Sequence, residues 1–359
     1  MVLPPSQSLD TFPLPWQSRV WSRLTSALQQ NELGHALLLA GKRGTGKRLL
    51  AEALAQLLLC QQPQSDSHRG VACGDCPSCQ LFRSGNHPDL VWIQPNGEDK
   101  PLLEVGRRLE GKDGERQIQV DQIRQLLERF ALVSRHGETK VAIIERSEMM
   151  NLSAANALLK TLEEPTKGTY LILMTEAPSR LLSTIRSRCH YYPVTVSPQD
   201  EMASLQWVAE CSGSTYEAVA SLASFMVAGP LEIRNLMMSE RKSEFSAFEQ
   251  TVLGLKNGRE DPVVAAAVWS RHSGSFFLHA FQLLLLALTK SMYGRGGESA
   301  SSSNTLERSL LSLFNDNRPA TDQWFNFVDQ SQKSGRLWQE HRVNRQLLLE
   351  ELLLSWHYL

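Results

Sequence analysis

Short apolar runs alternate with amphipathic segments along the first half of the chain. Five runs have the length of strands: residues 36–40, 90–94, 141–144, 170–174 and 191–196. The first four are almost continuously apolar, which is typical of parallel strands buried on both faces. The segments between them carry apolar residues at helical spacing, and strand, helix and strand in that order form right-handed βαβ units. The pattern therefore predicts an α/β fold with a parallel sheet.

The second half of the chain has only helical periodicity. Residues 199–240 form one short helical group interrupted at Gly229-Pro230, and 241–359 is helical apart from a Gly- and Ser-rich linker at 294–304. A chain of 359 residues is too long for one ordinary core. We therefore expect an α/β domain over 1–196, a small helical domain over 197–240 and an all-α domain over 241–359.

The segment 140–189 contains the clearest βαβ unit. We expect Ser153 to cap its helix and Pro165 to limit its end, while Asp121 caps the preceding helix over 122–130. A charged loop is expected over 95–116. Parallel sheets bind ligands beyond the carboxyl ends of their strands. Candidate functional positions therefore follow the strands directly, at Glu145, Arg146, Thr175 and Glu176.

A glycine-rich loop follows the first strand and opens a helix, in the G-x-x-x-x-G-K context of a P-loop. The glycines allow backbone N–H groups to face phosphate oxygens, and the lysine reaches the terminal phosphates. The next position normally holds Ser or Thr as a magnesium ligand, but here it is arginine, which cannot ligate a cation. The candidate nucleotide-binding residues are Gly41, Gly44, Gly46, Lys47 and Arg48.

The strand 141–144 ends in Glu145-Arg146, where an active P-loop ATPase has Asp-Glu. A glutamate at the first position still supports a metal, whereas an arginine stays protonated and cannot act as a base. Together with Arg48, this degenerate Walker B motif argues against hydrolysis by this chain.

Four of the six cysteines cluster at Cys60, Cys73, Cys76 and Cys79. In a chain without an export signal, such a cluster indicates a metal site more than disulfides. Four thiolates close a tetrahedral zinc site with no open position, so we expect structural Zn²⁺. An iron–sulfur cluster is the alternative, although the usual fourth cysteine followed by proline is absent.

Charge and hydropathy exclude few functions. The net charge is −1, so binding to nucleic acid or an anionic membrane requires a local patch. The N-terminus lacks a signal peptide pattern, and the longest apolar segment, 276–288, is broken by His279 and Gln282. We therefore expect a cytoplasmic protein with no membrane partner. A zinc module that grips DNA directly is a weak alternative, because 73–79 lacks aromatic and dense basic neighbours.

The P-loop, the four cysteines, ALLKTLEEP at 157–165 and Ser187-Arg188-Cys189, in that order, resemble the clamp-loader branch of the AAA+ superfamily. Within this branch the chain is most similar to the delta-prime family of bacterial DNA polymerase III. The resemblance extends over essentially the whole chain. It implies a RecA-like AAA+ domain that holds zinc, a helical lid and a helical collar that assembles with neighbouring subunits.

The resemblance also implies a role. Delta-prime family members are stators beside the ATP-hydrolysing gamma or tau motor subunits and the delta subunit, in a loader that places the sliding clamp on primed DNA within the polymerase III holoenzyme. Arg188 would be the arginine finger for the ATP of an adjacent subunit. The alternative is a clamp-loader ATPase in its own right, because Lys47 is retained and leaves ATP binding open. Motor subunits of this family carry an arginine in the lid that contacts the nucleotide. In this chain the corresponding arginine, Arg234, comes later in the segment 228–234, which argues against that contact.

Overall fold

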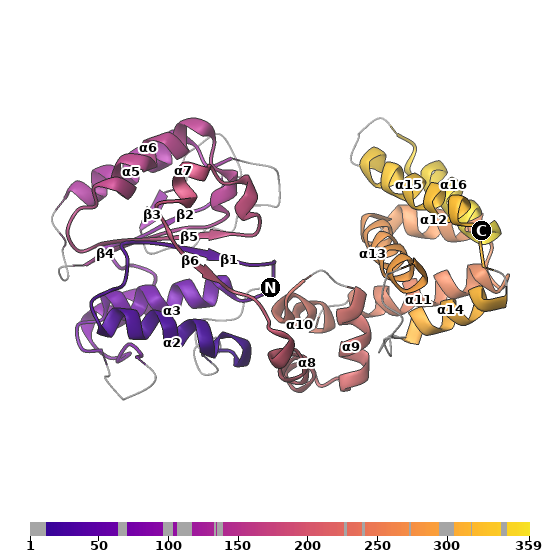
Figure 1. Cartoon of the computed structure of the whole chain (residues 1–359), viewed down its shortest axis with the longest axis horizontal. Coiled ribbons are helices and arrows are strands. Elements are labelled where there is room, and N and C mark those ends of the chain that lie inside the picture. Colours follow the sequence, from indigo (N-terminus) through magenta and orange to yellow (C-terminus); the bar gives the residue numbers. More distant parts are fainter. Residues whose placement is uncertain are drawn as a thin grey trace. The chain divides into compact units, whose positions relative to one another are not determined.

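The structure is a computed structural model that describes residues 12–63, 70–95, 103–105, 117–132, 134, 139–225, 228–238, 241–272, 274–293, 305–316, 318–338 and 343–359 (Figure 1). The chain forms two compact units, Met1–Ser204 and Leu205–Leu359. Each unit is described by itself.

The first unit is built on a six-stranded sheet with strand order β3-β2-β4-β5-β1-β6. Five strands are parallel, and the short β3 pairs antiparallel with β2 at one edge. The strands are β1 (Ala36–Ala40), β2 (Leu90–Ile93), β3 (Leu103–Val105), β4 (Lys140–Ile144), β5 (Thr169–Thr175) and β6 (His190–Pro193). The predicted parallel sheet is confirmed.

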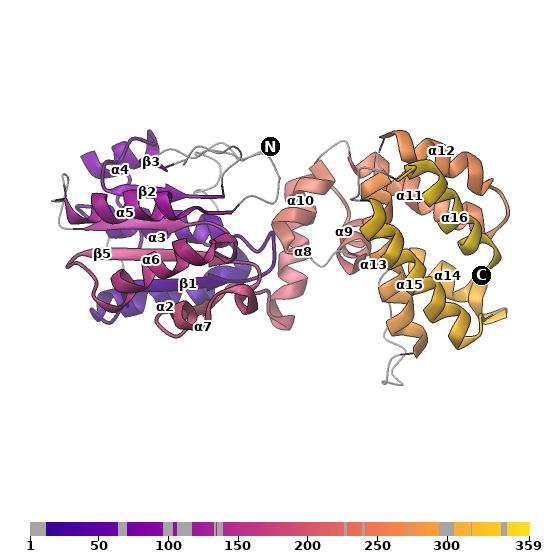
Figure 2. The same cartoon turned by 90° about the horizontal axis from the view of Figure 1, so that it is seen from above.

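Helices cover both faces of this sheet (Figures 1 and 2). One face packs on α2 (Ser18–Gln29), which η1 (Pro15–Gln17) precedes, and on α3 (Lys47–Leu59), and the other on α5 (Val120–Ala131), α6 (Leu152–Glu163) and α7 (Ser183–Arg186). Alternate residues of one strand enter different cores. Leu37 and Leu39 of β1 face the α2–α3 side, whereas Ala36 and Leu38 face the α5–α6 side. Burial on both faces explains why the sequence pattern is a continuous apolar run.

Local details differ from the sequence-based expectations. The N-cap of α6 is Asn151, whose side chain accepts from the N–H of Ala154, and not Ser153. Helix α5 begins after Gln119, whose N–H donates to the Gln122 side chain, so Asp121 lies inside the first turn. Most of the expected loop 95–116 lies outside the described residues, but Leu103–Val105 forms β3, because its backbone pairs with the free edge of β2.

The remaining elements of the first unit are η2 (Ser147–Met149), η3 (Pro178–Arg180) and α4 (Pro77–Arg83). The second unit is helical in its described part. Its helices are α9 (Tyr216–Phe225), α10 (Pro230–Met238), α11 (Arg241–Lys256), α12 (Pro262–His272), α13 (Gly274–Tyr293), α14 (Thr305–Asp316), α15 (Thr321–Trp338) and α16 (Arg345–Tyr358), and α8 (Pro198–Ser212) spans the boundary between the units.

The second unit contains two hydrophobic clusters. A small one joins α8, α9 and α10 through residues such as Val208, Val219 and Ile233. A larger one joins α11 to α16 around Trp324 and Trp356, both of which are fully buried. The expected linker 294–304 lies outside the described residues.

Helix α13 is long and apolar enough to meet a length-and-composition test for a membrane span, over Phe276–Tyr293. Within the unit, however, Phe277, Phe281, Leu284 and Leu288 of α13 are completely buried against the other helices. This is the packing of a core helix in a helical bundle.

Candidate functional site

The P-loop lies at the carboxyl end of β1 and leads into α3. Gly44 and Gly46 have φ values of 78° and 84°, a left-handed conformation that favours glycine. Two side chains near the N-terminus bind carbonyl groups of the P-loop. The Trp16 indole donates to Thr45 O at 3.0 Å, and the Gln17 amide donates to Thr45 O at 3.0 Å and to Gly46 O at 2.9 Å. A Cβ at Gly46 would lie 2.4 Å from Gln17 Nε2. The loop is therefore fixed in shape by a buried glutamine that the sequence did not single out.

The P-loop lysine is turned onto its own loop. Lys47 Nζ donates to Gly41 O at 2.7 Å and Lys42 O at 2.9 Å, and lies 4.0 Å from Glu176 Oε1. Burial lowers the pKa of Lys47, and the carboxylates of Glu176, Glu148 and Glu145 oppose that shift. A terminal phosphate would have to replace these carbonyl contacts to engage Lys47.

Arg48 is placed among carboxylates at the position where a P-loop NTPase ligates magnesium. Its guanidinium lies 3.7 Å from Glu145 Oε1 and 3.6 Å from Glu52 Oε1, and stacks over the Trp92 ring at 5.2 Å from the centroid. The Trp92 indole also donates to Glu145 Oε2 at 3.2 Å. Glu145, which was expected to support a metal ion, therefore contacts the Arg48 guanidinium instead.

Glu52 completes this cluster from the second turn of α3. Burial raises the pKa of Glu52 to about 7, with Arg48 opposing the rise and Glu145 adding to it. Sequence reasoning missed Glu52, although its position four residues after Arg48 on a helix is the signal for such an ion pair.

The remaining candidates at this edge have different surroundings. Arg146 is exposed and has a left-handed φ of 51° at the start of η2, so its side chain does not replace a buried general base. Thr175 is buried at the end of β5, and its hydroxyl accepts from the N–H of Ala177. Glu148 accepts from the N–H of Glu176 at 3.5 Å. Of the residues predicted to follow the strands, Glu145, Thr175 and Glu176 therefore lie beside the P-loop, whereas the side chain of Arg146 is exposed.

Arg188 lies at the amino-terminal end of the strands, opposite the carboxyl-terminal end where the P-loop lies. It precedes β6, which runs parallel to β1 with His190 level with Leu37. Arg188 lies two residues before β6, beside the amino-terminal end of β1, whereas Gly41 follows the last residue of β1, and the five residues of β1 span roughly 16 Å at about 3.3 Å per residue. Its guanidinium contacts Glu163 Oε1 at 2.6 Å and donates to Thr184 O at 3.0 Å. Arg188 cannot reach its own P-loop.

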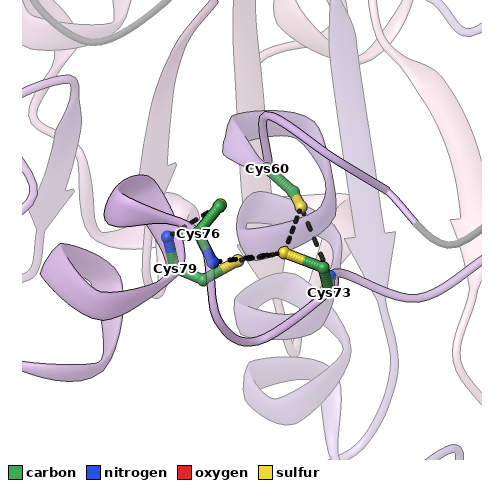
Figure 3. Close-up of side chains that lie close together, drawn as sticks. All are labelled: Cys60, Cys73, Cys76 and Cys79. Atoms are coloured by element: carbon green, nitrogen blue, oxygen red, sulfur yellow. Dashed lines mark hydrogen bonds between the residues drawn. The ribbon is translucent and has the colours of Figure 1, made fainter.

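The four predicted cysteines come together beside α3 and α4 (Figure 3). Their Sγ atoms all lie within 4.8 Å of one another, with Cys60 Sγ 3.5 Å from Cys73 Sγ and Cys73 Sγ 3.9 Å from Cys79 Sγ. Cys60 ends α3, whereas Cys76 caps α4 and its sulfur accepts from the N–H of Cys79. No disulfide joins them. The arrangement is able to hold one metal ion.

Backbone donors favour thiolates in this cluster. The N–H groups of Cys73, Cys76 and Cys79 donate to the sulfurs of Cys60, Cys73 and Cys76, respectively. Burial raises the pKa of Cys60 and Cys79, and although it acts in the same direction on Cys76, backbone donors and neighbouring thiols lower the pKa of Cys76 to about 6. Cys76 is therefore poised as a thiolate, whereas a bound cation would favour the thiolate form of the buried Cys60 and Cys79.

A buried hydrogen-bond chain ties this cluster to the sheet. Ser78 Oγ donates to Leu59 O at 2.6 Å and lies 2.8 Å from His87 Nε2, and His87 Nδ1 accepts from the N–H of Asp89 at 3.2 Å. His87 therefore links α4 and the end of α3 to the start of β2. His87 does not belong to the group of four cysteines that could bind a metal ion.

Arg234, the arginine that comes later than the expected lid motif, packs within its own unit. Its guanidinium stacks over the Trp207 ring at 5.7 Å and donates to Asn235 Oδ1 at 2.9 Å. The side chain is 8% exposed, so packing accounts for this residue.

The fold and the site together define the class of this protein. It is an AAA+ protein with an α/β P-loop domain, further helices, and an arginine in the place of the magnesium ligand. A sequence profile of the family described as "DNA polymerase III, delta subunit" matches residues 16–197. The chain is 31% identical over 349 residues to the DNA polymerase III subunit delta' of Yersinia pestis, a match covering 95% of this chain and 94% of that one. The chain belongs to the delta-prime subunit family of bacterial DNA polymerase III.

Two further relatives match a part of the chain. The subunit delta' of Pseudomonas aeruginosa is 39% identical over 223 residues, covering 62% of this chain and 60% of that one, which is less than two thirds of its length. The tau/gamma subunit of Haemophilus influenzae is 32% identical over 173 residues, covering 48% of this chain and 22% of that one. A gamma subunit-related protein of solved structure, from Thermotoga maritima, has a TM-score of 0.44 at 18% identity over 93% of this chain and 99% of that one.

Proposed function

We propose that this chain is a non-hydrolysing subunit of a DNA polymerase III clamp loader, which supplies Arg188 to the ATP site of an adjacent motor subunit. Its relatives are named as delta' subunits, and one as tau/gamma, which supports membership of the same complex. The proposed partners are gamma or tau motor subunits and a delta subunit, with the sliding clamp and primed DNA reached through the complex in the cytoplasm. We keep 1–196, 197–240 and 241–359 as the proposed AAA+, lid and collar domains.

The contact between Arg48 and Glu145 carries the proposal that this chain does not hydrolyse ATP. A magnesium ion bridging the nucleotide phosphates would have to share this space with a guanidinium 3.7 Å from the acidic residue that should support it. Like charges at such distances repel, and arginine offers no lone pair to the metal. The exposed Arg146 leaves no carboxylate at the general-base position.

The topology supports a role for Arg188 in trans. The length of β1 separates Arg188, which precedes the amino end of the neighbouring β6, from the P-loop at the carboxyl end of β1. The side chain is 36% exposed at an edge of the AAA+ unit, so it is accessible to a neighbouring subunit. A guanidinium that reaches a γ-phosphate stabilises charge that develops during phosphoryl transfer.

We also propose that the four-cysteine cluster holds structural Zn²⁺. With Zn–S distances of about 2.3 Å, a tetrahedral site places its sulfurs about 3.8 Å apart. The Sγ–Sγ distances of 3.5 Å between Cys60 and Cys73 and 3.9 Å between Cys73 and Cys79 lie on either side of this value. A 4Fe–4S cluster binds each thiolate to a different iron and so needs wider sulfur spacing. No protein position is left open for substrate, so the metal supports folding.

ATP turnover in two settings tests the function. We expect the isolated chain to hydrolyse no ATP, and Lys47→Ala to leave that result unchanged. In a loader reconstituted with its motor and delta subunits, we expect Arg188→Ala to preserve assembly and lower DNA-stimulated ATP turnover at saturating ATP. The exposed Arg186 of the same segment provides the control, as Arg186→Ala. Turnover by the isolated chain that Lys47→Ala abolishes, or an unchanged rate with Arg188→Ala, would contradict the proposal.

One observation favours the alternative of a self-sufficient ATPase. Lys47 keeps its place at the start of α3, and the P-loop glycines keep left-handed φ values. The same turnover measurement on the isolated chain distinguishes this alternative from the stator.

A further inference from the structure

We infer that Glu163 is a positioning residue for Arg188, holding the guanidinium in place before a neighbouring ATP arrives. The inference rests on the proposed function of Arg188. Glu163 is the last residue of α6, and its Oε1 lies 2.6 Å from Arg188 Nη2, a short charge-assisted contact.

Three buried residues fix the backbone on both sides of this pair. Leu162 precedes Glu163 and is 2% exposed, while Ile185 and Cys189 flank the Arg188 segment at 0% and 9% exposed. All three belong to one hydrophobic cluster beneath α6 and α7. The distance between the carboxylate and the arginine is therefore set by the core and not by two free surface side chains. Burial also raises the pKa of Cys189 to about 12, so this thiol stays neutral in the core.

Arg188 is held from two directions. While Nη2 contacts Glu163, Nη1 donates to Thr184 O at 3.0 Å and lies 3.5 Å from Ser187 Oγ. A guanidinium has five N–H donors, and these contacts leave Nε–H and further terminal hydrogens for another acceptor. A phosphate oxygen can therefore be bound while the Glu163 contact persists.

This arrangement has a kinetic consequence. An unrestrained arginine loses rotamer freedom when it engages a phosphate, and prior restraint reduces that entropic cost. Arg188 acts on charge that develops in the transition state. If its guanidinium is no longer held in place, kcat should therefore fall more than KM for ATP rises. Glu163 is exposed by half, so its contribution is to geometry and not to the stability of the fold.

The test is a set of variants in the reconstituted clamp loader, measured as DNA-stimulated ATP turnover. The part of kcat that depends on Arg188 is the difference between the wild type and Arg188→Ala. We expect Glu163→Ala to remove at least half of this part, with KM for ATP changed less than twofold. Glu163→Gln keeps the side-chain length and an oxygen acceptor, so it should restore most of the loss. Glu164→Ala, its exposed neighbour at the end of the same helix, should behave as wild type.

A double-variant cycle separates positioning from a general structural effect. In the Arg188→Ala background, Glu163→Ala should cause no further loss of kcat, and the thermal midpoint of the isolated chain should match that of Glu164→Ala. Equal rates for Glu163→Ala and Glu164→Ala, or a faster loader with Glu163→Ala, would overturn the positioning role while leaving the finger intact. An Arg188→Ala loader with full activity would overturn both the finger and this inference.

Discussion

At the scale of single residues, the two cations at the end of the P-loop motif both contact oxygen atoms of their own chain. Lys47, which should face phosphate, donates to two carbonyls of its own loop, and Arg48 lies beside Glu145 and Glu52. Each cation of the motif is thus matched by oxygen atoms of the chain. A nucleotide with its magnesium ion would compete with contacts that are already made.

Replacing Arg48 should recover part of the lost function. We expect Arg48→Thr to provide a hydroxyl ligand, free Glu145, and increase the Mg²⁺-dependent affinity of the isolated chain for ATP by at least about tenfold, roughly 1.4 kcal/mol. Calorimetric titration with and without Mg²⁺ measures this. Turnover should remain absent, because Arg146 is unchanged. Arg48→Lys keeps the charge without adding a ligand, and an equal gain with that control would show that magnesium ligation is not the cause.

The buried carboxyl of Glu52 makes stability depend on pH. Because burial raises its pKa in the folded chain from 4.5 to about 7, the folded state holds a proton that the unfolded state has lost within this window. Stability therefore falls as pH rises from about 4.5 to about 7, by up to about 3 kcal/mol for this group. Glu52→Gln should flatten this decrease.

Hydrogen exchange of β1 amides at pH 5 and pH 8, corrected for intrinsic rates, measures the Glu52 effect within its own unit. The exposed Glu128 supplies the control as Glu128→Gln, which should retain the pH dependence of the wild type. A Glu52→Gln protein with the same decrease in protection between the two pH values would show that Glu52 ionises normally.

At the scale of elements, the segment between α3 and β2 depends on its cysteines. Helix α4 is a seven-residue helix that begins at Pro77 directly after its Cys76 cap, and it is tied to α3 and β2 by Ser78 and His87. So short a helix is not stable on its own. A metal ion bound by Cys60, Cys73, Cys76 and Cys79 would hold it against the end of α3.

Loss of the metal should loosen this part of the chain alone. We expect the purified protein to contain about one zinc ion per chain, and Cys76→Ser to lose it and to exchange amide hydrogens faster over 70–95. The exposed Cys211 in the other unit gives the matched control, Cys211→Ser, with full metal content. Elemental analysis and hydrogen-exchange mass spectrometry provide the readouts. A Cys76→Ser protein that keeps stoichiometric zinc would contradict the four-thiolate site.

At the scale of the whole molecule, the two units have separate cores. The sheet of the first unit is enclosed by its own helices, whereas the larger cluster of the second unit surrounds Trp356, whose ring lies 5.2 Å from Phe281 and 5.8 Å from Phe327. Separate cores allow one unit to lose structure without the other.

Truncation of Trp356 tests this independence. A fully buried tryptophan replaced by alanine costs about 3–5 kcal/mol, so Trp356→Ala should unfold or strongly loosen the second unit. Metal content and β1 protection should remain at wild-type values. Tyr358→Ala, on the same helix but 80% exposed, should leave both units unchanged. Simultaneous loss of β1 protection in Trp356→Ala would show that the units unfold together.

Much of the architecture follows from local pattern. Continuous apolar runs predicted the parallel strands, the glycines and lysine predicted the P-loop turn, and the C-x-x-C-x-x-C spacing with Cys60 predicted the cysteine cluster. These predictions succeed because strand burial, left-handed turns and short ligand spacing are determined by residues close together in the chain. The predicted N-cap of α6 at Ser153 was wrong. Asn151 and Ser153 are both good capping residues, and only the path of the chain selects Asn151.

The sequence by itself therefore determined the class of fold, the departures from the P-loop and Walker B patterns at Arg48 and Arg146, and the four candidate metal ligands. Only the tertiary structure decided what those residues contact. Gln17 reaches the P-loop across 28 and 29 positions, and Glu145 contacts Arg48 across 97 positions. Glu163 reaches Arg188 because α6 and α7 share one core. Such contacts depend on how the sheet orders its strands, and no local periodicity records that order.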